Sequence, residues 1–194
     1  MREIKDELLA KLQESRAVVL AKATGLAEYD RRRPLTPTGT NLLGLVKHLT
    51  GMEYGYLGEC LGRPADPAPP WFADDPSSGT DMWASPEESG EEILAHYRHA
   101  CAHADETVRR NALESAAHVP WWAEAERDTT LGVLLIRMVA ETAQHAGHAD
   151  IVRELVDGQA GSPQDPVPED PQWRWQFTAR IAADAERFRR GPAE

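Results

Sequence analysis

Hydrophobic side chains recur every three or four residues along four long stretches of the chain, which is the spacing that gives an α-helix one buried face. No stretch alternates hydrophobic and polar residues for long enough to predict a β-sheet. We therefore predict an all-α protein built as an antiparallel four-helix bundle. The predicted helices are 3–23, 41–61, 86–112 and 130–158.

The residues at the ends of these stretches are types that begin or end helices. Asn41 precedes the second stretch, and Thr129 and Thr130 precede the fourth. Their side-chain oxygens can accept hydrogen bonds from the free backbone amides of a first helical turn. Gly62 follows the second stretch and Gly158 ends the fourth, as expected of residues that adopt a left-handed conformation. The fourth helix is the longest, and we expect it to be the central element.

The segment between the second and third predicted helices, 64–89, is rich in proline and has almost no helical period. Loops of this length in compact domains are usually functional rather than simple spacers. This one carries Trp71, Phe72 and Trp83. We expect a long loop whose aromatic side chains pack back onto the bundle.

The C-terminal part of the chain differs from the rest. A linker rich in proline, 161–171, precedes a more polar helical pattern over 172–190. We therefore divide the chain into a helical bundle over 1–160 and a C-terminal part over 161–194. The C-terminal helix is expected to pack on the bundle or on a dimer mate.

Three side chains can combine into a metal site. Glu141 and His145 are four residues apart and lie beside the core-facing stripe of the fourth helix, so their polar groups can converge. His48, at the flank of the second helix's apolar stripe, can add a ligand from a facing helix. Three protein ligands would leave coordination positions for water or substrate, as catalytic metal sites do. By itself the Glu-x3-His spacing also fits a solvated or structural role.

The other histidines have several possible roles. His148, three residues after His145, can be a fourth ligand, a proton shuttle or a partner behind a ligand. We favour a contact to a ligand or to substrate, and take His148 as the candidate catalytic residue. His96, His99 and His103 are spaced like ligands on one helix, but His99 faces away from the apolar stripe and the other two lie at its border. We interpret these three as part of a solvated face.

Some polar and aromatic residues are expected to be structural. Glu53 lies in the second helix's apolar stripe, where a carboxylate needs a partner. We predict a salt bridge to an arginine such as Arg137 or Arg153 and favour it over a catalytic base. Trp121 and Trp122 can wall a pocket, but large aromatic residues beside a proline more often pack.

Composition excludes several classes of function. The chain has 21 Lys and Arg against 32 Asp and Glu, a net charge of -11, which repels nucleic acid and anionic lipid. The charged N-terminal segment does not resemble a signal peptide, and no stretch is apolar enough for a membrane helix. We expect a cytoplasmic protein with no nucleic-acid or membrane partner. Cys60 and Cys101 form no CxxC motif and are interpreted as buried hydrophobic residues.

Two segments resemble the DinB superfamily of bacterial metal-binding four-helix bundles, in particular an uncharacterised branch related to mycothiol- and bacillithiol-dependent enzymes. They are LLGLVKHLTGMEYGYLGECLGRP and TTLGVLLIRMVAETAQHAGHADIVRELVDG, the second containing ETAQHAGHADIVREL. The resemblance covers about residues 1–160. It implies a His from the second helix and an E/H-x3-H pair from the fourth as ligands, which fall on His48, Glu141 and His145. It also implies a divalent ion, zinc or nickel, and a homodimer.

The same resemblance implies a function. The protein would be a metal-dependent transferase or isomerase that activates a low-molecular-weight thiol, mycothiol-like or bacillithiol-like, against a small electrophile. Two other readings stay open. In one, the bundle is a non-catalytic module that binds a metal or a small ligand. In the other, the polar cluster holds no metal and forms a hydrogen-bonded core.

Overall fold

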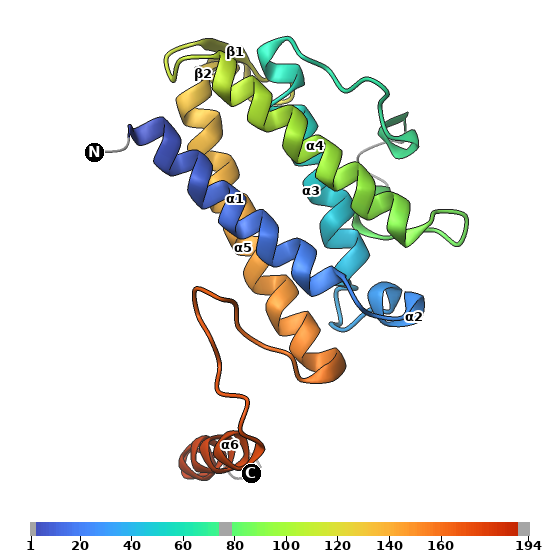
Figure 1. Ribbon diagram of the computed structural model, residues 1–194, viewed down its shortest axis with the longest axis vertical. Helices are drawn as coiled ribbons and strands as arrows, with labels where there is room; N and C mark the ends of the chain where they lie inside the picture. Colours follow the sequence, from blue (N-terminus) through green and yellow to red (C-terminus); the bar gives the residue numbers. More distant parts are fainter. Residues whose placement is uncertain (1–2, 74–78, 190–194) are drawn as a thin grey trace, which may run out of the picture. The chain divides into compact units, whose positions relative to one another are not determined.

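Four long helices lie side by side in the computed structural model, which describes residues 3–73 and 79–189 (Figure 1). The long helices are α1 (Ile4–Ala23), α3 (Leu42–Tyr56), α4 (Gly90–Arg110) and α5 (Leu131–Asp157). α1 packs along α5, α3 packs along α4, and α3 also contacts α5. The predicted all-α bundle is confirmed, and α5 is its longest helix.

Some of the predicted helix-capping residues form the caps in the structure. The Asn41 side chain accepts a hydrogen bond from the backbone amide of Gly44 at 2.7 Å, which caps α3 as predicted. Gly158 ends α5 in the left-handed conformation, with φ 78°. Thr130 precedes α5 but its side chain makes no capping hydrogen bond. Instead, the Leu131 amide donates to a backbone carbonyl of the preceding connection at 2.9 Å.

Three short elements were not predicted. They are a helix, α2 (Glu28–Arg32), and two antiparallel strands, β1 (Ala116–His118) and β2 (Asp128–Thr130). A strand of three residues shows too little alternation to be recognised from its sequence.

The second predicted helix ends earlier than expected. α3 stops at Tyr56, and the chain continues in a short 3-10 turn, Glu59–Leu61. Gly58 permits the change of direction, because a β-carbon there would lie 2.4 Å from the carbonyl oxygen of Tyr54. At the other end of the long loop, α4 begins at Gly90, after the predicted start at residue 86.

The long loop after α3 follows the bundle in two 3-10 turns, η2 (Pro70–Ala73) and η4 (Thr80–Met82); its residues 74–78 lie outside the described part. Trp71 packs against the core as predicted. Phe72 places its ring edge-on to Tyr54, with centroids 5.8 Å apart. Trp83 is about half-exposed, so only part of the aromatic content packs inward.

The interior contains a buried ion pair between two hydrophobic clusters. Arg16 on α1 donates two hydrogen bonds of 2.6 Å to the carboxylate of Glu53 on α3, and a third of 2.5 Å to Asp105 on α4. The predicted salt bridge of Glu53 exists, but the predicted partners, Arg137 and Arg153, were wrong. A pattern along one helix cannot identify a partner on another.

Residues Ala160–Glu194 form a separate compact unit with one helix, α6 (Pro171–Glu186). Asp170 caps it by accepting a hydrogen bond from the Gln172 amide at 2.9 Å. The rings of Trp173 and Phe177 stack 4.8 Å apart on its surface. Within the described residues, no helix combines the length and the hydrophobicity that crossing a bilayer requires.

Candidate metal centre

Glu141 and His145 lie one turn apart on α5, beside its buried face. The Nε2 atom of His145 is 3.0 Å from Oε1 of Glu141. Thr142 and Ala146, their neighbours on the helix, are buried in the bundle. Glu141 and His145 therefore lie at the border between core and solvent, where a polar site can be held by the bundle and still be reached.

His48 on α3 faces this pair from the other side. Its Nε2 atom is 3.4 Å from the same Oε1 atom of Glu141, and the rings of His48 and His145 lie 5.1 Å apart. One ligand atom of each of the three residues lies within 4.8 Å of the others. The structure thus brings together the three residues that the sequence singles out from two distant segments.

Asp81 in η4 is a member of the site that sequence reasoning missed. Its Oδ2 atom is 2.8 Å from Nδ1 of His48. A metal-binding histidine commonly donates its second ring N–H to a carboxylate, which fixes the ring and its tautomer. Asp81 lies 33 residues after His48, in a segment without helical periodicity. No pattern in the sequence signals that contact.

The first turns of α3 hold the Asp81 segment in place. The Met82 carbonyl lies so close to Gly44 that a β-carbon at Gly44 would be 1.9 Å from its oxygen. The same carbonyl accepts a hydrogen bond from the side-chain amide of Asn41 at 3.0 Å, and the Lys47 ammonium donates to the Trp83 carbonyl at 3.1 Å. Gly44 is needed here because of this close backbone approach.

The proton arrangement of the site favours a cation. With Nδ1–H of His48 donating to Asp81, its Nε2 carries a lone pair that points at the carboxylate of Glu141. Burial lowers the pKa of His145, and nearby His48 lowers it further, against the opposing effect of Glu141. Burial raises the pKa of Glu141, but the two histidines outweigh it and the pKa is lowered. When Nε2 of each imidazole is unprotonated, the two histidines and the carboxylate direct lone pairs to one point.

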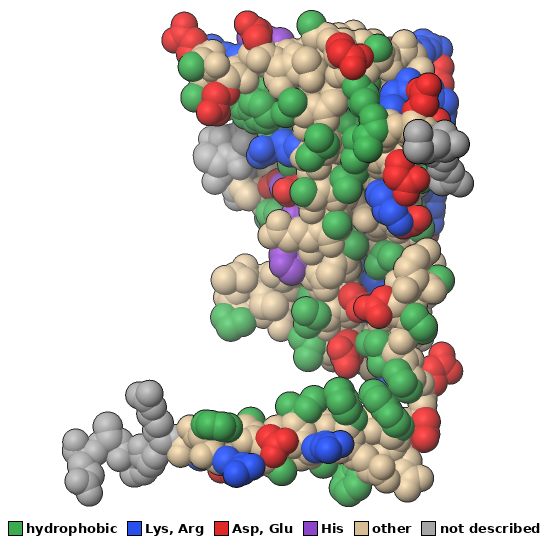
Figure 2. Space-filling model, turned by 90° about the vertical axis from the view of Figure 1, so that its left-hand side faces the viewer, with side chains coloured by type: hydrophobic (Ala, Val, Ile, Leu, Met, Phe, Trp, Pro, Cys, Tyr) green, Lys and Arg blue, Asp and Glu red, His purple; other side chains and the backbone are tan. Residues whose placement is uncertain are grey.

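The spacing and exposure of these atoms fit a divalent ion. Four ligands at about 2.0 Å in tetrahedral geometry are separated by about 3.3 Å. Two of the three separations, 3.0 Å and 3.4 Å around Oε1 of Glu141, are close to that value, and all three ligand atoms lie within 4.8 Å of one another. The side chains of His48, Glu141 and His145 are 21%, 26% and 12% exposed. These partial exposures leave the group open to small molecules. Figure 2 shows that histidine side chains reach the surface on one face of the molecule.

His148 lies behind His145 rather than within the group. Its Nδ1 atom is 3.4 Å from Nδ1 of His145, and the side chain is exposed. When Nε2 of His145 faces Glu141, its Nδ1–H can donate to His148.

The three histidines of α4 do not converge. Nδ1 of His99 is hydrogen-bonded to the Tyr54 hydroxyl at 2.7 Å, and His103 contacts the Arg63 carbonyl at 2.9 Å. His96 packs its ring against Trp71. His99 is exposed and the other two are half-buried, as predicted for a border of the solvated face.

A cleft of about 450 Å³ opens next to the group. Its lining includes Asp81 as well as Phe72 and Trp121. Trp121 therefore lines a pocket, which is the alternative that the sequence left open beside packing, whereas Trp122 packs against the hydrophobic core as favoured. Both tryptophans donate an indole N–H to the Tyr56 hydroxyl, at 3.1 and 3.2 Å.

Fold and site together define a class of protein, a helical bundle in which a His–Glu–His group open to solvent can bind a metal ion. The family model of the mycothiol-S-transferases matches residues 7–158, which is nearly the whole bundle. The chain belongs to the mycothiol-S-transferase family, within the DinB-like superfamily that the two sequence segments resemble. A comparison with curated proteins found no match.

Proposed function

We propose that this protein is a metal-dependent enzyme that transfers a low-molecular-weight thiol, with mycothiol as the first candidate, to a small electrophile. The observation that carries the proposal is the meeting of three lone-pair donors from α3 and α5 at an open site. Membership of the mycothiol-S-transferase family supports the choice of mycothiol over bacillithiol.

In this proposal His48, Glu141 and His145 hold a divalent ion. The ion would supply Lewis-acid activation that lowers the pKa of a thiol toward neutrality. His48 and His145 contribute neutral Nε2 atoms, and the Glu141 carboxylate balances part of the positive charge. Two imidazoles and one carboxylate suit zinc or nickel, and these are the ions we propose.

Two further residues position the ligands. Asp81 accepts the Nδ1–H of His48 and so keeps Nε2 free of a proton. His148 accepts the Nδ1–H of His145, which places the remaining ring proton of His148 on Nε2. We assign to His148 the positioning of His145 and the exchange of protons with solvent at that Nε2 atom.

The proposal is tested by measuring metal content and thiol conjugation in the same preparations. Purified protein should carry about one divalent ion per chain by mass spectrometry, and conjugate mycothiol to an electrophile only when loaded. His145→Ala and Glu141→Gln should lose both properties. Glu154→Gln, which removes a carboxylate from an exposed position of the same helix, should lose neither.

The outcomes separate this proposal from the other readings. A bound ion without any conjugation would favour a module that binds a metal or a small ligand. Full conjugation by protein stripped with a chelator would exclude the metal-dependent reaction. A preparation that takes up no ion would leave a hydrogen-bonded polar core as the explanation of the group.

We further propose that two copies associate through α5. Ile136, Ile151 and Leu155 on this helix are each more than half-exposed, which gives a second copy an apolar surface to cover. Light scattering during gel filtration should give twice the mass of the chain. The mass of one chain at all concentrations would contradict the dimer.

A further inference from the structure

The cleft beside the metal centre extends along one face of α3. Gly51, Met52 and Gly55 line it and follow His48 by three, four and seven residues, which places all four on the same side of the helix. Asp81, which contacts His48, also lines the cleft. A molecule in the cleft would therefore lie next to His48, one of the three candidate metal ligands.

The floor of the cleft is helix backbone left bare by two glycines. A β-carbon at Gly55 would lie 3.5 Å from Cη2 of Trp121, and one at Gly51 would lie 3.9 Å from Cε1 of Phe72. A side chain longer than a methyl group at Gly51 or Gly55 would push these rings out of place. The glycines thus let the edges of two aromatic rings approach the helix, and both rings line the cleft.

The aromatic walls are held in place by their neighbours. Trp121 donates its indole N–H to Tyr56, and the two rings meet edge to face with centroids 5.4 Å apart. Phe72 meets Tyr54 edge to face at 5.8 Å. Trp121 remains 49% exposed and Phe72 38% exposed. Fixed rings with exposed surfaces suit stacking with a flat apolar molecule.

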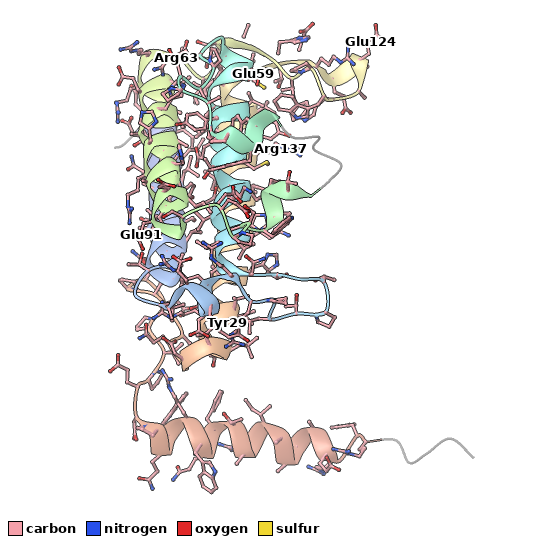
Figure 3. The ribbon with its side chains drawn as sticks, turned by 90° about the vertical axis from the view of Figure 1, so that its right-hand side faces the viewer. Tyr29, Glu59, Arg63, Glu91, Glu124 and Arg137 are labelled. Atoms are coloured by element: carbon pink, nitrogen blue, oxygen red, sulfur yellow. The ribbon has the colours of Figure 1, made fainter. Side chains whose placement is uncertain are left out.

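The charge of the cleft selects against anions. Its only ionisable lining groups among the described residues, apart from the Tyr56 phenol, are the carboxyls of Asp81 and Glu59. Glu59 lies just beyond the C-terminal end of α3, where Figure 3 labels it. The nearby Arg137 guanidinium, labelled beside α3 in Figure 3, lies over the Tyr56 ring at 5.2 Å rather than in the lining.

From these observations we infer that the cleft binds the electrophile, and that this electrophile is an uncharged, planar aromatic molecule with its reactive carbon toward His48 and Asp81. A volume of about 450 Å³ accommodates a fused two-ring system with a short substituent. The catalytic consequence rests on the proposed thiol transfer, whereas the binding does not. For a naphthylmethyl chloride, the thiolate sulfur forms a bond to the methylene carbon, the carbon–chlorine bond breaks, and chloride leaves with the bonding pair.

Binding is tested by calorimetry with 2-naphthalenemethanol, an unreactive analogue of that electrophile. Gly55→Leu would displace the Trp121 ring and occupy part of the cleft, and Trp121→Ala removes a wall, so each should weaken binding at least tenfold. The control is Trp175→Ala, which removes an exposed tryptophan of α6 and should leave binding unchanged. The anion 2-naphthoate and the saturated analogue decahydro-2-naphthalenemethanol should each bind at least tenfold more weakly than the aromatic alcohol.

Equal affinity in Gly55→Leu, Trp121→Ala and unmodified protein would overturn the assignment, provided that circular dichroism shows folded variants. Stronger binding of 2-naphthoate would overturn the charge argument. His145→Ala should lose metal and turnover but still bind 2-naphthalenemethanol, so failure of the proposed enzymatic function does not remove this test. In turnover, Trp121→Ala should raise the KM for a naphthylmethyl chloride at least tenfold and leave the KM for iodoacetamide unchanged.

Discussion

Asp81 is the residue whose role follows from the structure alone, and removing its charge gives a sharp test of the site. Asp81→Asn keeps the size of the side chain but replaces the carboxylate that faces Nδ1 of His48 at 2.8 Å. The amide can still accept a hydrogen bond but no longer carries charge. We expect the His48 ring to be held less firmly and to be a weaker ligand.

The size of the effect can be bounded. Loss of a partner behind a metal-binding histidine typically lowers metal affinity about 10- to 100-fold, or about 1.4 to 2.7 kcal/mol. The side chain of Asp81 is 41% exposed, so solvent screens its charge, and we expect a value near 10-fold. Asp81→Ala, which removes the acceptor altogether, should lie nearer the upper end.

Metal affinity is measured by competition with a chromophoric chelator at pH 7. Glu87→Gln is the matched control, because it removes one exposed carboxylate from the same long loop and should leave affinity unchanged. Gly44→Ala should resemble Asp81→Asn, since its β-carbon would displace the Met82 carbonyl and with it the Asp81 segment. Unchanged affinity in both Asp81→Asn and Asp81→Ala would refute the role of this carboxylate.

Three further predictions concern the scaffold. Arg16→Met leaves the Glu53 carboxylate buried without its guanidinium and should cost about 3–5 kcal/mol in urea unfolding, whereas adding Glu53→Leu should recover most of the loss; equal stability of the two variants would contradict this. A chain ending at Gln159 keeps every residue of the metal centre and should bind metal with unchanged stoichiometry; loss of cooperative thermal unfolding would show that the bundle needs the C-terminal unit. Burial raises the pKa of Cys60 to about 11 and raises that of Cys101 further, so alkylation by iodoacetamide should be slow at pH 8 and accelerate as the pH rises toward 11; rapid labelling at pH 8 would contradict it.

Sequence patterns could predict the bundle because its helices are long and repeat their hydrophobic spacing over several turns. They could also select Glu141 and His145, since two residues four apart on one helix must share a face. His48 came from its place beside an apolar stripe, together with the resemblance to a family. Predicting the fold required only local periodicity. Predicting the ligand group also required an assumption about which helices face each other.

The remaining features depend on contacts between segments that carry no local signal. Asp81 lies in a loop whose path is set by the close approach to Gly44, and the partner of Glu53 lies on α1. Trp121 was named as a possible pocket wall, but packing was favoured for the same reason, because the exposure of its ring depends on contacts such as that with Tyr56. Such positions are fixed by tertiary packing and not by the period of any one helix.

The central claim is that His48, Glu141 and His145 share one cation. An anomalous difference map from crystals of the metal-loaded protein, recorded at the absorption edge of the bound element, locates that ion directly. We predict a single peak at about 2.0–2.2 Å from Nε2 of His48, Nε2 of His145 and a carboxylate oxygen of Glu141. A peak at other side chains, or no peak in protein saturated with zinc or nickel, would contradict the account.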